Sequence, residues 1–103
     1  MFDKYKDMYK FQQQARAIQK DLKKTYFEAG SSNGVVTVIA NGMQQIEEVK
    51  INFGEQADYY VKNPERLGRE LTDVANKALQ KAQKASAERM QGIMGSSGGM
   101  FGA

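Results

Sequence analysis

The sequence predicts a small α+β domain in which a long N-terminal helix, an antiparallel β-hairpin or three-stranded sheet, and a long C-terminal helix follow one another. Three observations support this order. The first 29 residues contain neither glycine nor proline, a stretch rich in β-branched residues surrounds Asn41-Gly42, and a second helix-rich segment starts at Pro64. At 103 residues the chain forms one domain at most.

The N-terminal segment has the spacing of an amphipathic helix. Its apolar residues recur three and four positions apart and form one continuous stripe: Met1, Tyr5, Met8, Phe11, Ala15, Ile18, Leu22 and Tyr26. Gly30 suits the position just after a helix, because glycine adopts the left-handed conformation found there. We therefore expect a helix over residues 1–29.

The central stretch carries the pattern of a β-hairpin. Asn41-Gly42 is typical of a two-residue type I′ turn, which requires positive φ at both central positions. This turn would place Ala40 opposite Met43. Glu47 then falls on the more apolar face of the ribbon, so we expect it at an edge or beside a β-bulge.

The C-terminal half begins with a possible third strand and continues as a helix. Residues 57–61 are compatible with a short strand, which would extend the sheet over 34–61. Asn63 is a good N-cap and Pro64 a good first helical residue, so a helix is expected over 64–94. Its stripe is narrowed by alanine: Leu67, Leu71, Val74, Ala78, Ala82 and Ala85. Residues 1–94 form the single domain, and 95–103 read as a flexible glycine- and serine-rich tail.

The two helices are too long for the hairpin to cover. Each would span about 40 Å, against about 20 Å for a six-residue strand, so we expect them to project together as an antiparallel arm. A ribbon that is apolar on both faces makes a poor monomer, and dimerisation through the sheet would cover it. The alternative is a compact monomer with both helices folded over the sheet. The residues expected at the dimer interface are Val35, Val36, Val38, Ile39, Ile46, Val49 and Ile51.

The composition argues against an enzyme. The chain has no cysteine and no histidine, which removes thiol chemistry, the commonest general base and the commonest metal ligand. No phosphate-binding glycine motif occurs, so we expect no cofactor, no metal and no small-molecule substrate. Neither a signal sequence nor a run of about 18 apolar residues is present, and we expect a cytoplasmic protein without a membrane partner.

The basic side chains gather in the helices. Residues 1–29 hold seven basic and four acidic side chains, and residues 64–103 hold six and four, whereas residues 30–63 hold two and four. Such rows could follow a phosphate backbone, although lysines on exposed helix faces also serve solubility. In the antiparallel arm, Lys4, Lys6 and Lys10 near the tip should lie level with Lys81, Lys84 and Arg89. The candidate DNA-binding residues are Lys4, Lys6, Lys10, Arg16, Lys20, Lys23, Lys24, Lys77, Lys81, Lys84 and Arg89.

The chain also resembles a known family. The first helix leads into Gly34-Val35-Val36-Thr37-Val38, then Asn41-Gly42 and Val49-Lys50-Ile51, and the later helix carries Leu67, Leu71 and Asn76-Lys77-Ala78. These features are similar to the YbaB/EbfC family of bacterial nucleoid-associated proteins. The resemblance implies an intertwined homodimer with protruding helical arms, bound to DNA in the nucleoid with limited sequence preference.

A protein-binding function is the competing hypothesis. Prefoldin-type chaperones also place a hairpin between two long helices, and exposed methionine and aromatic residues near the arm tip would then hold unfolded clients. Salt separates the two hypotheses, because phosphate contacts make affinity steeply salt-dependent. The family resemblance, together with the doubling of each basic row in a dimer, favours double-stranded DNA held mainly through its phosphates.

Overall fold

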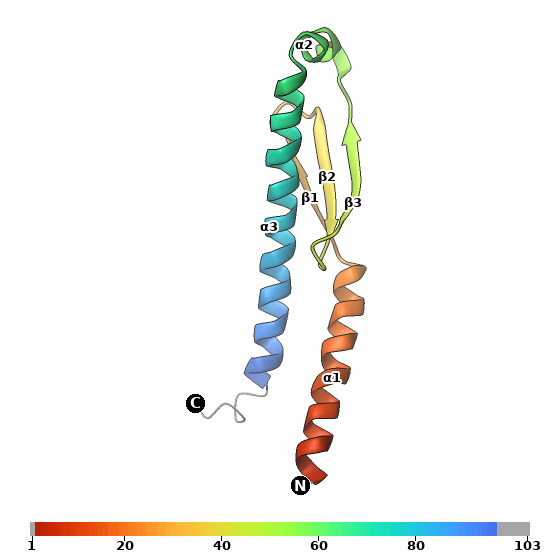
Figure 1. The fold of residues 1–103 in the computed structure, drawn as a ribbon, viewed down its shortest axis with the longest axis vertical. Coiled ribbons are helices and arrows are strands. Elements are labelled where there is room, and N and C mark those ends of the chain that lie inside the picture. The colour runs from red at the N-terminus through yellow and green to blue at the C-terminus, as the bar shows by residue number, and fades with distance from the viewer. Residues whose placement is uncertain (1, 97–103) are drawn as a thin grey trace.

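The computed structural model describes the backbone of residues 2–96 and the side chains of residues 7–92. Figure 1 shows two long helices beside a small sheet. The elements are α1 (Phe2–Lys23), β1 (Tyr26–Gly30), β2 (Val36–Asn41), β3 (Ile46–Ile51), the 3-10 turn η1 (Gly54–Gln56), α2 (Ala57–Lys62) and α3 (Pro64–Ser96). The predicted α+β class is confirmed. The tail predicted over 95–103 lies outside the described residues from position 97 onward.

The three strands form one antiparallel sheet in the order β1-β2-β3, and α3 packs across one face of β1 and β2. Ala29, Val36, Val38 and Ala40 point from the sheet into this interface, where they meet Val74 and Ala78 of α3; all are buried. Small alanines let the helix approach the strands closely. The N-terminal half of α3 therefore contributes to the core of the domain. The helix packs along the sheet there and does not project away from it from its first residue.

The first helix is shorter than predicted. It ends at Lys23, and the next segment is strand β1, where the sequence pattern had indicated a helix up to residue 29. The Leu22 carbonyl, which residue 26 would use in a continuing helix, accepts a hydrogen bond from the Gly42 N–H at 2.8 Å. Tyr26 and Phe27 also favour strands intrinsically. Tertiary contact with the hairpin thus overrides the helical pattern.

The third strand of the sheet is β1, and the prediction of a strand over residues 57–61 was wrong. That segment forms the short helix α2, which turns the chain back toward α3. Helix α3 begins at Pro64 as predicted, but Asn63 is no side-chain N-cap. Its side-chain amide donates instead to the carbonyl of Tyr59 at 3.0 Å and so closes the end of α2.

The hairpin turn is also longer than predicted. Ala40 pairs with Ile46 and not with Met43, and the Asn41 N–H donates to the Gln45 carbonyl across the loop. The buried Asn41 side chain accepts hydrogen bonds from the backbone N–H groups of Met43 and Gln45, which organises the loop. The register shifts between Ile39 and Ala40, which leaves Glu47 as the extra residue. The bulge expected near Glu47 is confirmed.

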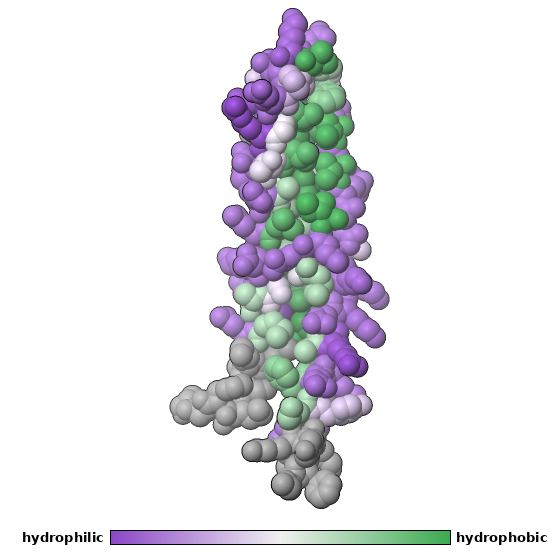
Figure 2. All heavy atoms as spheres, viewed as in Figure 1, coloured by the Kyte–Doolittle hydropathy of each residue, from purple (hydrophilic) through white to green (hydrophobic). Residues whose placement is uncertain are grey.

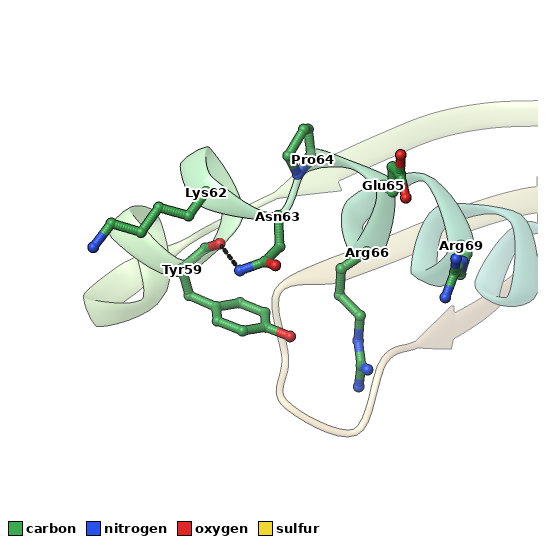
Figure 3. A pocket seen from close by; sticks show the side chains of 7 residues that line it. All are labelled: Tyr59, Lys62, Asn63, Pro64, Glu65, Arg66 and Arg69. Atoms are coloured by element: carbon green, nitrogen blue, oxygen red, sulfur yellow. Dashed lines mark hydrogen bonds between the residues drawn. The ribbon is translucent and has the colours of Figure 1, made fainter.

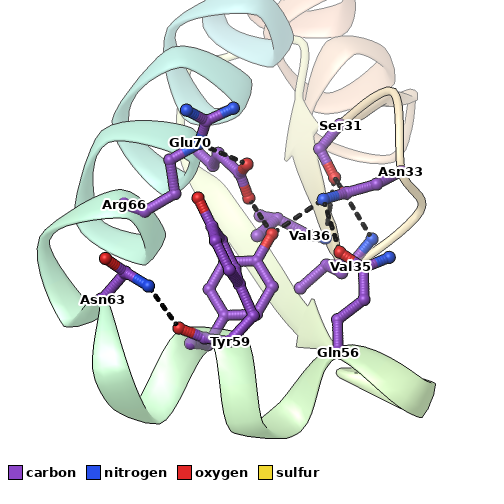
Figure 4. Close-up of polar contacts among 10 residues, drawn as sticks. Ser31, Asn33, Val35, Val36, Gln56, Tyr59, Asn63, Arg66 and Glu70 are labelled. Carbon is purple, nitrogen blue, oxygen red and sulfur yellow. Dashed lines mark hydrogen bonds and ion pairs between the residues drawn. The ribbon is translucent and has the colours of Figure 1, made fainter.

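A buried tyrosine joins three segments at the end of the sheet that is remote from the chain termini. The Tyr60 hydroxyl donates to Glu70 at 2.5 Å and accepts from the Asn33 side-chain amide at 2.7 Å. Glu70 in turn pairs with Arg66. Figure 4 shows how this network connects the loop before β2 with α2 and α3. Tyr60 therefore fixes the position of α2 on the sheet.

The ionisation of Glu70 couples this network to pH. The hydrogen bond from Tyr60 holds the pKa of Glu70 below its ordinary value of 4.5, with Arg66 assisting and burial opposing. A carboxylate whose folded pKa is depressed stabilises the fold above about its ordinary pKa, and this contribution is lost as pH falls through the folded value. Acid should therefore weaken the attachment of α2.

Tyr60→Phe should lower the stability at pH 7 and flatten its decline between pH 6 and pH 3. The variant removes the main cause of the low Glu70 pKa, so less stability is left to lose in acid. Urea unfolding at several pH values measures both effects. Tyr59→Phe is the matched control, because Tyr59 is exposed. An unchanged acid dependence in Tyr60→Phe would contradict this assignment.

Candidate nucleic-acid interface

Three lysines of α3 surround a hollow beside the free edge of β1. Lys77, Lys81 and Lys84 line it together with Gln80, Ala29 and Gly30, and its volume is about 320 Å³. Among the residues that the structure describes, no carboxylate lines it. The spacing of four and three residues places the lysines on one face of the helix. We call this set the lysine hollow.

The edge of β1 contributes to the lysine hollow through its backbone. The Ser31 N–H bonds to the Val36 carbonyl at 2.9 Å, so in this antiparallel pair the backbone groups of Glu28 and Gly30 point away from β2. The Lys81 ammonium donates to the Glu28 carbonyl at 2.8 Å. This contact shields an otherwise open strand edge and holds one cation in place.

A second basic row lies on α1. Arg16, Lys20 and Lys23 border a shallow hollow of about 280 Å³ with Met43 and Gln45 of the hairpin loop. All three cations are exposed. They share one side of α1 because they are spaced four and three residues apart. This row is the second place where predicted DNA-binding residues come together.

The remaining basic residues on the arm are placed differently. Lys10 and Lys24 are exposed, whereas the side chains of Lys4 and Lys6 lie outside the described part. Arg89 pairs with Asp21 across the two helices at 2.5 Å. Arg89 therefore lies level with the sheet-proximal end of α1, and the predicted alignment of Arg89 with Lys10 was wrong. The cause is that the first turns of α3 pack on the sheet, so that only later turns of the helix reach α1.

Sequence reasoning left out a basic cleft at the opposite end of α3. Tyr59, Lys62, Arg66 and Arg69 line it, with Asn63, Pro64 and Glu65, and its volume is about 430 Å³. Figure 3 shows the guanidinium groups of Arg66 and Arg69 on the same side of the helix, with the Tyr59 ring beside them. We call it the head cleft. The helical angle of Arg66, close to that of Lys77, was the available signal.

The residues expected at a dimer interface fall into two groups. Val35, Val36 and Val38 are buried within the single chain. Ile39 lies on the sheet face opposite α3, where it pairs with Glu48. Exposed apolar side chains follow β3 and its loop on the α3 side of the sheet, and we call them the β3 strip: Met43, Ile46, Val49 and Ile51.

The β3 strip continues onto α3. Helix α3 packs mainly on β1 and β2, so β3 extends beyond it. Leu71, Ala75 and Leu79 of α3 are only partly buried along the same side. Figure 2 shows apolar side chains gathered over this part of the molecule, with polar ones flanking them. The four exposed side chains of the strip are between 38% and 47% accessible, which is high for consecutive inward-facing residues of a strand.

The described part of the chain contains neither a helix long and apolar enough to cross a membrane nor a group of side chains suited to a metal ion. The face of the sheet opposite α3 is acidic: Glu47 and Glu48 line a shallow depression there with Tyr26 and Ile39. Polyanions would be repelled from this face. The electrostatic contrast would favour the helices over this face as the contact for a polyanion.

Comparison with known proteins identifies relatives along nearly the whole chain. The profile of the YbaB/EbfC DNA-binding family matches residues 1–97. A nucleoid-associated protein of Acetivibrio thermocellus is 32% identical over 97 residues, which cover 94% of this chain and 83% of that protein. One from Chloroflexus aurantiacus is 32% identical over 90 residues, 87% of each chain. One from Dictyoglomus thermophilum is 30% identical over 97 residues, 86% of this chain and 83% of that protein.

A solved structure shares the fold. The crystal structure of an uncharacterised protein from Helicobacter pylori superposes with a TM-score of 0.68 at 15% sequence identity. The match covers 84% of this chain and 96% of that one. The arrangement of two long helices around a three-stranded sheet therefore recurs where little sequence similarity is left.

Proposed function

Because this chain belongs to the YbaB/EbfC DNA-binding family, we propose that it binds double-stranded DNA as a homodimer and helps to organise the nucleoid. The contacts are mainly to phosphates. Lysine ammonium groups neutralise phosphate charge without reading base edges, so sequence preference is limited. The relatives named nucleoid-associated proteins support this assignment.

The lysine hollow is the observation that carries the proposal. Three cations lie side by side along one helix face, with no carboxylate among the described residues that line it. A solubilising surface normally intersperses both signs of charge, as the Arg89–Asp21 pair does here. A cluster of one sign in a concave site attracts a polyanion.

We propose that a second copy of this chain packs against the β3 strip and buries it. The radius of gyration is 19.6 Å, against about 13 Å for a compact chain of this length. The accessible surface of 7883 Å² exceeds by about 2,000 Å² the area expected for a compact protein of this mass. That excess is of the size that stable interfaces bury. Two chains joined through their β3 strips would hold two lysine hollows at a fixed separation.

Lys77→Gln and Lys84→Gln should each weaken DNA binding and reduce its salt dependence. The slope of log affinity against log salt should decrease by about 0.9 for every phosphate that the protein no longer neutralises, and each substitution removes two such cations from a dimer. Gel-shift titrations of a duplex at two or more salt concentrations measure the slope. The mass of the free protein in solution, determined alongside, tests the dimer.

Lys50→Gln is the matched control, because it removes the same charge from an exposed position that pairs with Thr37 on the acidic face of the sheet. It should leave the slope nearly unchanged. If all three substitutions had equal effects, net charge alone would explain them, and the lysine hollow would make no specific contribution to binding. Binding of unfolded protein that does not respond to salt, with no duplex bound, would favour the chaperone function.

A further inference from the structure

The head cleft and the lysine hollow lie on the same face of α3. Arg66 and Lys84 are separated by about five complete helical turns, so their side chains leave the helix in the same direction. Lys77 deviates from this direction by only about 20°. Arg66, Lys77 and Lys84 thus form one line along the helix, which spans about 27 Å at 1.5 Å per residue, and Arg69 lies about 60° to one side of it.

The cations of the head cleft are available to a ligand. Arg66 uses its Nε for the ion pair with Glu70 at 3.2 Å, and Figure 3 shows its guanidinium directed into the cleft. In the part of the chain that the structure describes, neither Arg69 nor Lys62 is paired with a carboxylate. Both side chains are exposed. They line the cleft together with the exposed Tyr59, and Glu65 is the one carboxylate among the described residues that line it.

We propose that the head cleft is a second phosphate-binding site of the DNA interface, so that a DNA backbone follows α3 from Lys84 past Lys77 to Arg69 and Lys62. This inference rests on the proposed function and enlarges its site. At 3.4 Å per base pair, the line of cations corresponds to about eight base pairs per protomer. The DNA then lies along the sheet-bearing half of α3, and the end of the arm near the chain termini is not required.

An exposed carboxylate provides an internal test of this path. Asp73 lies between the two sites, about 20° from the direction of Arg66 on the same helix face. A phosphate backbone that passes from the lysine hollow to the head cleft must cross it at close range. Asp73 therefore opposes binding in this geometry, and its removal should strengthen binding.

Arg69→Gln and Lys62→Gln test the head cleft itself. Each should weaken duplex binding several-fold and lower the salt slope by about 0.9 per phosphate no longer neutralised, as Lys84→Gln does. Arg66 is left intact because it pairs with Glu70 beside the buried Tyr60. Lys50→Gln again serves as the control of equal charge. Circular dichroism and the solution mass of each variant establish that fold and dimer are retained.

Asp73→Asn tests the same path through a change in duplex affinity of the opposite sign. It should tighten duplex binding several-fold at low salt, whereas Glu48→Gln, which removes an exposed carboxylate on the acidic face of the sheet, should change it much less. Wild-type affinity in Arg69→Gln, Lys62→Gln and Asp73→Asn, together with weaker binding in Lys77→Gln and Lys84→Gln, would overturn the head cleft and leave the proposed function standing. Wild-type affinity in all five would overturn both the head cleft and the lysine hollow as DNA contacts, whereas a wild-type protein that binds no duplex would overturn the proposed function itself.

Discussion

Gly42→Ala should destabilise the protein by about 1–3 kcal/mol, because the new methyl group has no room. A Cβ atom at this position would lie 2.7 Å from Leu22 Cδ2 and 2.8 Å from the Leu22 carbonyl oxygen. That carbonyl accepts the Gly42 N–H, so the last turn of α1 and the hairpin loop meet backbone to backbone. The substitution pushes α1 away from the sheet.

Urea unfolding at equal protein concentration measures the destabilisation, since the stability of a dimer depends on concentration. DNA affinity should fall with it, because the basic row on α1 and the β3 strip both adjoin the displaced loop. Gly68→Ala is the matched control. No atom of the described residues lies within 4 Å of a Cβ at Gly68, and alanine there should stabilise α3 by up to about 1 kcal/mol. Equal stability of the two variants would contradict the steric account.

Val49→Lys should separate the proposed dimer and weaken DNA binding by more than tenfold, although it adds a positive charge. Val49 is 43% exposed in the β3 strip and pairs with Val38 across the sheet, so one chain tolerates the change at little cost. At the centre of an interface between two copies, the buried ammonium has no partner and is strongly unfavourable. Sedimentation or light scattering gives the mass, and a gel-shift titration gives the affinity.

Glu48→Lys controls for charge and strand propensity on the same strand. Its side chain points to the opposite face, beside Ile39, and the variant should remain dimeric and bind DNA at least as tightly as the wild type. A Val49→Lys variant that keeps the wild-type mass would show that the β3 strip is not the interface. A monomer with undiminished affinity would show that one chain binds DNA alone.

The amino-acid pattern determined the class of fold and the general chemistry. Helical periodicity, the β-branched runs around Asn41 and the start of α3 at Pro64 are local signals. The structure confirms the two long helices, the strands on either side of Asn41 and the start at Pro64, although α1 ends earlier than its periodicity indicated. The bulge at Glu47 followed from the period of two along a strand, which forced a carboxylate onto the apolar face. The grouping of cations on the helices followed from helical spacing in the same way.

Tertiary contacts decided what the local pattern left open. Tyr26–Gly30 continues a helical stripe in sequence, but pairing with β2 and the bond from Gly42 to Leu22 convert it into a strand. Asn41-Gly42 favours a tight turn, but Gly42 is needed where Leu22 approaches, and so the loop lengthens. In both places a contact between residues about 20 positions apart outweighs a preference of a few tenths of a kcal/mol per residue.

The same distinction applies to the candidate site. Sequence spacing alone shows that Lys77, Lys81 and Lys84 share a helix face, because that depends only on the helical repeat. Their position at the edge of β1, and the alignment of Arg89 with Asp21, depend on how far α3 runs along the sheet before it reaches α1. That offset is set by the packing of Val74 and Ala78 on the strands, which no local pattern encodes. The helical repeat determines which cations share a helix face, and the packing of the core determines which other elements lie next to them.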